Sequence, residues 1–343
     1  MPDISAFHAS PARLELEVGE GAGARLDRWL TDHVQDRTRS QIQNDLEAGN
    51  IAVNGAAQPA RYKVRAGDQI IYVIPAPDTE RLKPESIPLE ILYDDEHVIV
   101  VNKPAGMVVH PAPGHHGGTL ANALLAHCGP SLAGVGGEGR WGIVHRLDAQ
   151  TSGLMVAARS TLAYRALTAA IAERAVSRRY LGIVIGMMHQ DSGSIDKPLG
   201  RRTSDRKKIG VTKEGQGRPS QTDWRVVVQD GGLALLGLTL HTGRTHQIRV
   251  HLESIGRPIL SDTDYGWTLP RTLAAVTPKL RPQLGAVWPG RQMLHATRLK
   301  FDHPATGKTL EFTAMPPDDM QAVLNLVWPE KWRAAIDSWL SMQ

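Results

Sequence analysis

Apolar and polar positions along the first part of the chain, residues 13–75, predict a small mixed unit. Apolar residues recur there at helical spacing, and Thr38 lies three residues before Gln41, as in a capping box. The Asn54-Gly55 pair follows a short apolar run and is typical of a tight turn between strands. The predicted elements are helices over 24–30 and 38–46 and strands over 51–53 and 69–74.

From residue 89 onward, the pattern predicts a larger domain in which strands and helices do not alternate strictly. Strict alternation would favour a doubly wound parallel sheet, so this order favours an α+β domain built on a mixed, mostly antiparallel sheet. The predicted strands cover 89–93, 98–101, 180–185, 224–228, 233–239 and 310–313, and the predicted helices cover 120–127, 162–173, 245–254 and 320–327.

Two further segments complete the predicted organisation. Residues 1–12 are expected to form a flexible tail. Residues 76–88 are polar and punctuated by proline, as in a linker between domains. The chain is therefore expected to consist of a tail (1–12), a small domain (13–75), a linker (76–88) and a large domain (89–343).

The composition is that of an ordinary soluble globular protein, with 41% hydrophobic and 22% charged residues among 343. The sequence contains no apolar run long enough to span a bilayer, and its first residues lack the charged-then-apolar pattern of a secretory signal. A single cysteine, Cys128, excludes an internal disulfide and a Cys-x-x-Cys zinc site. A cytoplasmic location is expected.

The distribution of charge says more than the net charge, which is only +4. Residues 196–218 contain eight Lys and Arg against three acidic residues, an excess of +5. Such a run is either a solvated face or a loop that contacts phosphate groups, and the sequence supports the two interpretations about equally.

The segment with the most chemical content is GIVHRLDAQTSGLMV, residues 142–156. An apolar strand is expected to enter a charged turn with small residues, and an apolar strand follows it. Rigid strands on both sides of a turn can hold a carboxylate, here Asp148, in a cleft. By composition alone, a structural salt bridge between Arg146 and Asp148 is the favoured interpretation.

Other patterns in the sequence do not predict a different chemistry. Ser152 shares one short loop with His145 and Asp148, but no Gly-x-Ser-x-Gly elbow is present for a serine nucleophile. The histidines at 241, 246 and 251 are spaced by five and do not share one helical face, so no metal site is expected.

The small unit resembles the alpha-L (S4-like) RNA-binding domain through ARLDRWL, RTRSQIQNDLEAGNIAVNG and the Gly67-Asp68 turn. In that family two helices present basic residues to RNA. Acidic and basic residues nearly balance over 13–68, so a purely structural role stays open. The candidate RNA contacts are Arg37, Arg39, Arg61, Lys63 and Arg65, and the basic segment adds Arg201, Arg202, Arg206, Lys207 and Lys208.

The large domain resembles the pseudouridine synthase family typified by the class A enzyme of large-subunit ribosomal RNA and tRNA. Its signature, HRLD-x-x-TSG-L, stands at 145–154. GIVHRLD and GGTLANALLAHC resemble the D-type large-subunit members most. Further blocks match in the same order: VIVVNKPAGMVVHP (98–111), RRYLGIVIG (178–186), HTGRTHQIRVHLESIGRPILSD (241–262) and LHATRLKFDHPATGKTLEFTAMPPD (294–318).

This resemblance implies roles for four residues. Asp148 is implied to be the catalytic carboxylate, and Arg244, in the TGRTHQ block, to pair with it. Tyr180 is implied to face the target base, and Arg146 to take part in extruding the uridine and filling its place. The reaction adds no atoms and transfers no electrons, so no cofactor or metal is expected.

The expected function is isomerisation of uridines in a stem-loop of 23S large-subunit ribosomal RNA, or of the assembling large subunit, by a monomer that does not contact membranes. A tRNA enzyme of the same family is the nearest alternative. A non-catalytic RNA-binding protein of ribosome assembly would lack the Asp-Arg-Tyr set. A nuclease or other hydrolase would need a metal cluster or an activated serine, and the sequence indicates neither.

Overall fold

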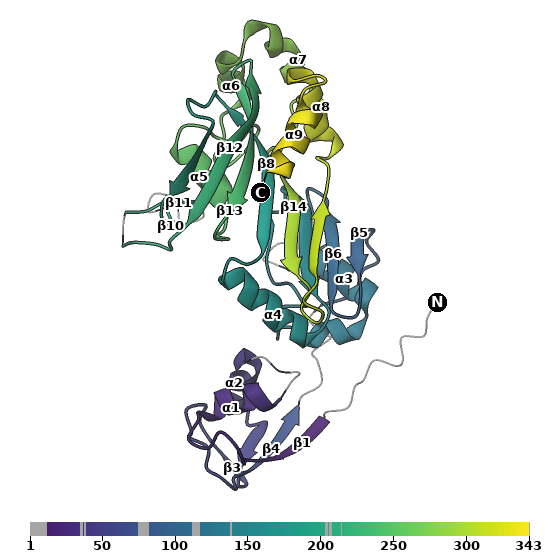
Figure 1. Cartoon of the computed structure of the whole chain (residues 1–343), viewed down its shortest axis with the longest axis vertical. Helices are drawn as coiled ribbons and strands as arrows, with labels where there is room; N and C mark the ends of the chain where they lie inside the picture. Colours follow the sequence, from purple (N-terminus) through teal and green to yellow (C-terminus); the bar gives the residue numbers. More distant parts are fainter. Residues whose placement is uncertain are drawn as a thin grey trace.

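The computed structural model describes residues 12–34, 37, 39–74, 82–111, 117–137, 139–202, 205, 208–213 and 215–342. These residues form a small N-terminal unit and a large body, which succeed each other along the long axis of the molecule (Figure 1). The predicted tail, apart from Ala12, and the capping residue Thr38 lie outside the described residues. No helix within the described ranges is long and apolar enough to cross a membrane.

The small unit is an antiparallel sheet in the strand order β1-β4-β2-β3 with two helices packed against it. Both helices and the sheet contribute to one apolar cluster that includes Leu30, Ile42 and Ile70. The predicted turn is confirmed: Asn54 and Gly55 both have positive φ angles, 51° and 78°. The elements are β1 (Ala12–Glu17), α1 (Leu26–His33), α2 (Arg39–Glu47), β2 (Ile51–Val53), β3 (Ala56–Ala57) and β4 (Gln69–Ile74).

The large body is built on a nine-stranded sheet in the order β5-β6-β7-β14-β8-β13-β12-β9, with β15 paired to β14. Among the strand pairs that the structure describes in this sheet, β7–β14 is parallel and the rest are antiparallel, which confirms the mixed, mostly antiparallel sheet. The strands are β5 (Glu90–Asp94), β6 (Val98–Lys103), β7 (Ser152–Ala158), β8 (Ser177–Ile185), β9 (Ser192–Asp196), β12 (Gln221–Asp230), β13 (Leu233–Leu240), β14 (Leu294–Asp302) and β15 (Thr309–Thr313).

Helices and one small hairpin surround this sheet (Figure 1). Local capping fixes two of the helix starts: Thr119 and Asn122 form a capping box before α3, and the Ser160 side chain accepts from the backbone N–H of Ala163 in α4. The helices are α3 (Leu120–Cys128), α4 (Thr161–Ala172), α5 (Gln247–Ser254), α6 (Leu269–Ala275), α7 (Arg281–Ala286), α8 (Asp318–Val327) and α9 (Trp332–Ser341), and the hairpin is β10 (Leu199–Arg201) with β11 (Ile209–Val211).

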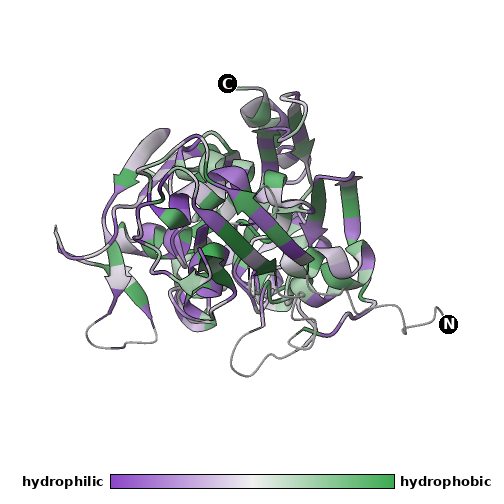
Figure 2. Cartoon of the chain, turned by 90° about the horizontal axis from the view of Figure 1, so that it is seen from below, coloured by the Kyte–Doolittle hydropathy of each residue, from purple (hydrophilic) through white to green (hydrophobic). Residues whose placement is uncertain are grey.

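Along several strands, apolar and polar residues alternate, as the coloured bands in Figure 2 show. The strands were predicted from this alternation. That signal fails at β14, which lies in the middle of the sheet and which the pattern did not predict. His295 and Thr297 on this strand are buried, but both are hydrogen-bonded to the carbonyl of Ala314. Polar residues satisfied in this way hide a buried strand from a hydropathy pattern.

The strand expected at the start of residues 142–156 is not present. Gly142 has a φ of 72°, and Ile143 makes only an isolated bridge to Ala157. A Cβ at Gly142 would lie 2.0 Å from the carbonyl oxygen of Ala158, so the chain passes against β7 in a turn that only glycine allows.

The predicted linker also differs from the structure in its described part, from residue 82 onward. The Leu82 side chain is 1% exposed and belongs to the core of the large body. The Asn122 side chain donates to the carbonyl of Lys83 (2.8 Å), and the backbone N–H of Gly118 donates to the Glu85 carboxylate (3.1 Å). This segment therefore packs against the start of α3 instead of spanning a gap.

Described contacts between the small unit and the large body involve α4 and the short 3-10 helix Pro130–Gly134. Arg165 on α4 donates to the carbonyl oxygens of Thr31 (3.2 Å) and Val34 (3.3 Å), at the end of α1. Gln41 on α2 donates to the carbonyl of Gly134 (3.1 Å). The cation on Arg165 thus lies at the negative end of the α1 dipole.

Candidate active site

Asp148 lies on the short loop that leads into β7. The backbone N–H of Thr151 donates to the carbonyl of Asp148 (3.0 Å) and closes the loop. Every residue of β7 is buried, and a Cβ at Gly153 would lie 2.3 Å from the carbonyl oxygen of Ala296, so β7 and β14 approach unusually closely. A rigid, tightly packed strand therefore fixes one end of the loop that carries the carboxylate.

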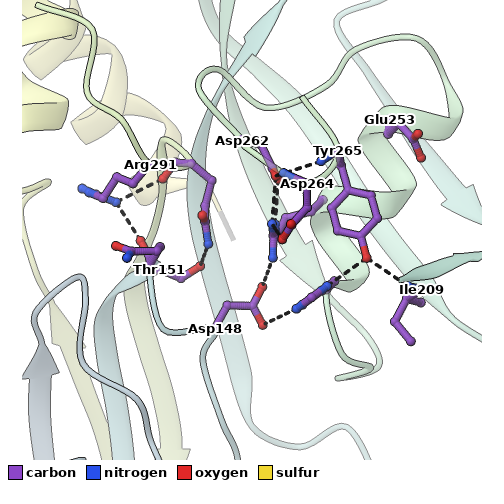
Figure 3. A network of polar contacts seen from close by, with 12 residues as sticks. Asp148, Thr151, Ile209, Glu253, Asp262, Asp264, Tyr265 and Arg291 are labelled. Carbon is purple, nitrogen blue, oxygen red and sulfur yellow. Dashed lines mark hydrogen bonds and ion pairs between the residues drawn. The ribbon is translucent and has the colours of Figure 1, made fainter. Parts of the chain in front are cut away.

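The Asp148 carboxylate is held by Arg249, which comes from α5. Nη1 of Arg249 donates to Oδ2 of Asp148 at 3.1 Å. The other side of the same guanidinium is bound by Asp262 in a bidentate pair (2.6 and 2.8 Å) and by Asp264 (2.8 Å). Figure 3 shows this network, with Asp148 facing Asp262 and Asp264 across the arginine. Three carboxylates thus fix one buried cation.

The electrostatics of this cluster favour charged partners. Burial by itself disfavours the charge on Arg249, but hydrogen bonds and charges from Asp262, Asp148 and Asp264 raise the pKa of its guanidinium above the usual value. His246 lies on the other side of Asp148, with Nε2 3.9 Å from Oδ1. Burial lowers the pKa of His246, although the Asp148 charge opposes the shift.

The expected pairing of Arg244 with Asp148 is wrong in this structure: the described ion pair to Asp148 from an arginine comes from Arg249. Arg244 precedes α5 in an exposed loop, and its backbone N–H donates to the side chain of Gln247 (3.0 Å). Arg249 stands five residues later, in the buried part of α5, where it pairs with Asp262 and Asp264. One sequence signal could have identified Arg249: it is a charged residue between the apolar Ile248 and Val250 in the predicted helix 245–254.

Tyr180, Arg146 and Arg244 do gather around Asp148. All four line a small cavity in front of the carboxylate and also an adjoining cavity of about 490 Å³. Tyr180 is 4% exposed, and its hydroxyl has no hydrogen-bond partner among the described residues. Burial and the Asp148 charge raise the pKa of the Tyr180 phenol. Arg146 and Arg244 are exposed at the mouth of these cavities.

Lys103, which the sequence pattern did not indicate as a site residue, stabilises the loop that carries Asp148. The Lys103 side chain, at the end of β6, is fully buried and donates to the carbonyl oxygens of Pro104, Met107 and Ala149 (2.8 to 3.0 Å). Burial lowers the pKa of Lys103 to about 7, and the nearby charge of Asp148 opposes this shift. Because Ala149 directly follows Asp148, Lys103 helps to fix the position of the carboxylate.

The candidate RNA contacts on the small unit belong to a part of the fold separate from the large body that carries Asp148 (Figure 1). Arg61, Lys63 and Arg65 are exposed on the segment between β3 and β4. Arg39 instead pairs with the buried Asp27 (2.9 Å), whose pKa is held well below its usual value by hydrogen bonds from Arg25, Arg39 and Gln43 despite its burial. Arg37 lies over the ring of Tyr72, with its Cζ 6.0 Å from the centroid.

The described candidates in the basic segment, Arg201, Arg202 and Lys208, lie on or next to the β10–β11 hairpin. Arg202 pairs with Glu253 (2.5 Å), and Lys208 donates to the carbonyl of Asp264 (2.9 Å), so the hairpin is tied to the site network. Arg201 lines a cavity of about 490 Å³ together with Arg218 and Arg244. Arg206 and Lys207 lie outside the described residues.

Each of the three evenly spaced histidines has a polar partner within the protein. His241 pairs with Asp223 (2.5 Å), His246 with the hydroxyl of Tyr265 (2.9 Å), and His251 with Thr222 (2.9 Å) and the carbonyl of Lys197 (3.0 Å). Within the described ranges, no three His, Cys, Asp or Glu side chains are grouped so that they could hold a metal ion.

Comparisons with known proteins agree on one family. The sequence model of RNA pseudouridylate synthase matches residues 97–254. Ribosomal large subunit pseudouridine synthase D of Zymomonas mobilis is 40% identical over 312 residues, which cover 90% of this chain and 95% of that protein. An uncharacterised RNA pseudouridine synthase of Bacillus subtilis is 40% identical over 305 residues, 89% of this chain and 94% of that protein.

The fold is similar to that of a solved human protein, RNA Pseudouridylate Synthase Domain Containing 1. The TM-score is 0.54 at 24% sequence identity, and the similarity covers 76% of this chain and 98% of that one. At this identity the likeness concerns the fold alone, and it agrees with the α+β architecture described above.

Proposed function

The chain belongs to the RNA pseudouridylate synthase family and isomerises uridine to pseudouridine in RNA, and from this premise we propose that Asp148 is its catalytic carboxylate and that its target is a stem-loop of 23S ribosomal RNA. The chemistry breaks the bond between N1 and C1′, turns the uracil and joins C5 to C1′. A carboxylate next to the sugar serves this reaction either as a nucleophile at C1′ or as a base toward C2′.

The observation that carries the assignment of Asp148 is that its carboxylate lines the cavity and is bound there by Arg249. Asp148 is the single carboxylate among the described residues that line the two adjoining cavities. Its partner Arg249 is 4% exposed and fixed by two further carboxylates. A rigid cation holds the carboxylate in one orientation before the substrate binds, as catalysis by a positioned group requires.

The other predicted site residues fit the same reaction. The Tyr180 side chain lines the cavity, where its ring can stack on an extruded uracil and its hydroxyl can reach the base. Arg146 stands beside the carboxylate at the cavity mouth, where a side chain can fill the space that the uridine leaves in the RNA. Arg244, which does not bind Asp148 here, is placed to contact RNA at the same mouth.

The substrate proposal rests on three features. The relatives in Zymomonas mobilis, Nitrosomonas europaea and Neisseria meningitidis are named ribosomal large subunit pseudouridine synthase D. We propose that the small unit is an alpha-L RNA-binding domain, which can grip helices away from the reacting loop. The exposed cations Arg61, Lys63 and Arg65 on that unit support this role. An open cavity that reads a flipped base by stacking would accept several neighbouring uridines.

The decisive experiment is chemical mapping of pseudouridine in total RNA from cells with and without the gene, followed by assay of the purified protein. We expect the sites that disappear to lie in one stem-loop of large-subunit RNA, and the protein to modify that RNA or assembling subunits but little bulk tRNA. Modified tRNA with untouched ribosomal RNA would show that the substrate proposal is wrong, while the reaction itself would stand.

A further inference from the structure

Arg178, at the start of β8, is a buried cation with no partner among the described residues. The residue is 6% exposed, and its guanidinium lines the 490 Å³ cavity beside Asp148 and Tyr180. In the part of the chain that the structure describes, it makes no hydrogen bond or ion pair, and its Nε is buried with no acceptor. Buried arginines are normally paired, because an unpaired charge loses its hydration without compensation.

Arg178 and Arg249 differ in how their buried charges are paired. Both arginines are more than nine-tenths buried in the wall of the same site. Arg249 is bound by three carboxylates, which is the usual solution for a buried guanidinium. Nothing comparable faces Arg178 among the described residues. Gly243 instead leaves room at its end, since a Cβ there would lie 3.0 Å from Nη1.

Two more polar atoms in the same wall lack partners. Nδ1 of His110 and Nδ1 of His145 are buried without a hydrogen bond among the described residues, and both histidines line the cavity. Burial and the charges of nearby arginines lower the pKa of His110 to about 4, and burial and Arg178 lower that of His145 to about 3. Unsatisfied buried groups around one cavity point to a polar ligand that is absent from the free protein.

The charge of the cavity indicates an anionic ligand. Asp148 is its single described carboxylate, and that group is already bound to Arg249. Against it stand five arginines that line the cavity: Arg140, Arg146, Arg174, Arg178 and Arg244. Four of these are exposed and can bind phosphates loosely, whereas Arg178 is buried and held in one place. A fixed guanidinium is suited to one particular phosphate.

We propose that Arg178 is a positioning residue that binds one backbone phosphate next to the target uridine, so that the uracil lies on Tyr180 and its sugar on Asp148. The proposal rests on the assignment of this cavity as the active site. Residues 178 and 180 project from the same face of β8, about 7 Å apart along the strand. The strand thus offers a ring for the base and a guanidinium for a phosphate of the same or the next nucleotide.

The first test compares Arg178→Met with Arg225→Met, a matched control. Arg225 is an exposed arginine of the same sheet that lines a separate surface pocket with Trp339. Removing an unpaired buried charge should leave the Tm of Arg178→Met at or above that of the wild type, while its RNA affinity falls about 10- to 100-fold. Arg225→Met should change neither by much. A lower Tm with unchanged affinity would overturn the proposal, because it indicates a structural arginine.

The second test locates the phosphate. The probe is a synthetic RNA stem-loop in which the wild-type protein forms pseudouridine, carrying an uncharged methylphosphonate at one linkage at a time. One linkage beside the target uridine should weaken wild-type binding, and Arg178→Met should be insensitive to that same linkage. Arg178→Lys, which keeps the charge, should recover part of the affinity and of the sensitivity.

The wild-type scan also decides the case if Arg178→Met does not fold. An even response, with no sensitive linkage beside the target, overturns the proposal. The result is separable from the choice of substrate: if the modified stem-loop comes from tRNA, the 23S proposal fails while this scan proceeds on the tRNA stem-loop.

Discussion

Nη1 of Arg249 lies 3.1 Å from Oδ2 of Asp148, although the two residues are 101 positions apart in the chain. The contact joins the loop before β7 to the buried face of α5. It gives the proposed catalytic carboxylate a fixed, charged partner before RNA binds.

Asp148→Asn should lower turnover by about a thousandfold or more, because an amide can act neither as nucleophile nor as base. The side chain keeps its size and can still accept from Arg249, so folding and RNA affinity should persist. Quantification of pseudouridine by mass spectrometry of digested RNA measures the loss, and a gel-shift assay measures the affinity. Activity close to that of the wild type would refute the assignment.

Arg249→Met and Arg244→Met should have different effects. Removing Arg249 leaves Asp262, a fully buried carboxylate, without its bidentate partner, and should lower the free energy of unfolding by about 3–5 kcal/mol along with activity. Arg244 is exposed, so its loss should change stability by less than about 0.5 kcal/mol and act mainly on RNA affinity. Urea denaturation monitored by fluorescence distinguishes the two. Equal stability of both variants would contradict this account of the network.

Tyr180→Phe tests the hydroxyl separately from the ring. The raised pKa of Tyr180 keeps the hydroxyl protonated in the working range, and the variant removes only that group. We expect about a hundredfold lower turnover with little change in RNA affinity. Tyr180→Leu, which also removes the stacking surface, should weaken binding as well. Unchanged turnover in Tyr180→Phe would limit this residue to stacking.

The small unit should add RNA contacts without supplying chemistry. A protein lacking residues 1–75 is expected to bind RNA more weakly and less selectively, with a shallower salt dependence because fewer phosphates are contacted. Replacing Arg61, Lys63 and Arg65 together by Gln in the full chain is the gentler version, since all three are exposed. Filter binding over a range of salt concentrations gives the slope. Identical slopes and target choice would assign the unit another role.

Acid should destabilise the protein partly through two histidines, the buried His295 and the half-buried His145. Burial lowers the pKa of His145 to about 3 and that of His295 to about 4, whereas an unfolded histidine titrates near 6.5. Below about pH 6.5 the unfolded chain binds the extra protons, so stability is fully present above this pH and is lost as the pH falls toward 4.

Each of these histidines should contribute up to about 1.4 kcal/mol per pH unit in that range. His295→Gln removes one titrating group, and its unfolding free energy should therefore depend less steeply on pH between 6.5 and 4. The comparison with the wild type cancels the contribution of the carboxylates. Parallel pH profiles for the two proteins would show that His295 is already charged in the folded state.

The sequence by itself predicted most of the elements, and its resemblance to the family singled out Asp148 as the candidate catalytic carboxylate. Apolar periodicity is a local property, so helices such as α3 and strands such as β13 were predicted within a residue or two. The block around Asp148 combines a charged turn with small residues next to a buried strand. That pattern can be recognised in the sequence without knowledge of the fold.

The tertiary structure alone decided which side chains meet. Arg244 and Arg249 stand in one sequence block and Arg244 also lines the cavity, but the described ion pair from an arginine to Asp148 comes from Arg249 in α5. Leu82 was expected in a linker and lies in the core, and Arg178, which precedes the predicted strand 180–185, is a buried cation with no partner among the described residues. Burial and pairing depend on contacts between distant segments, which no local pattern encodes.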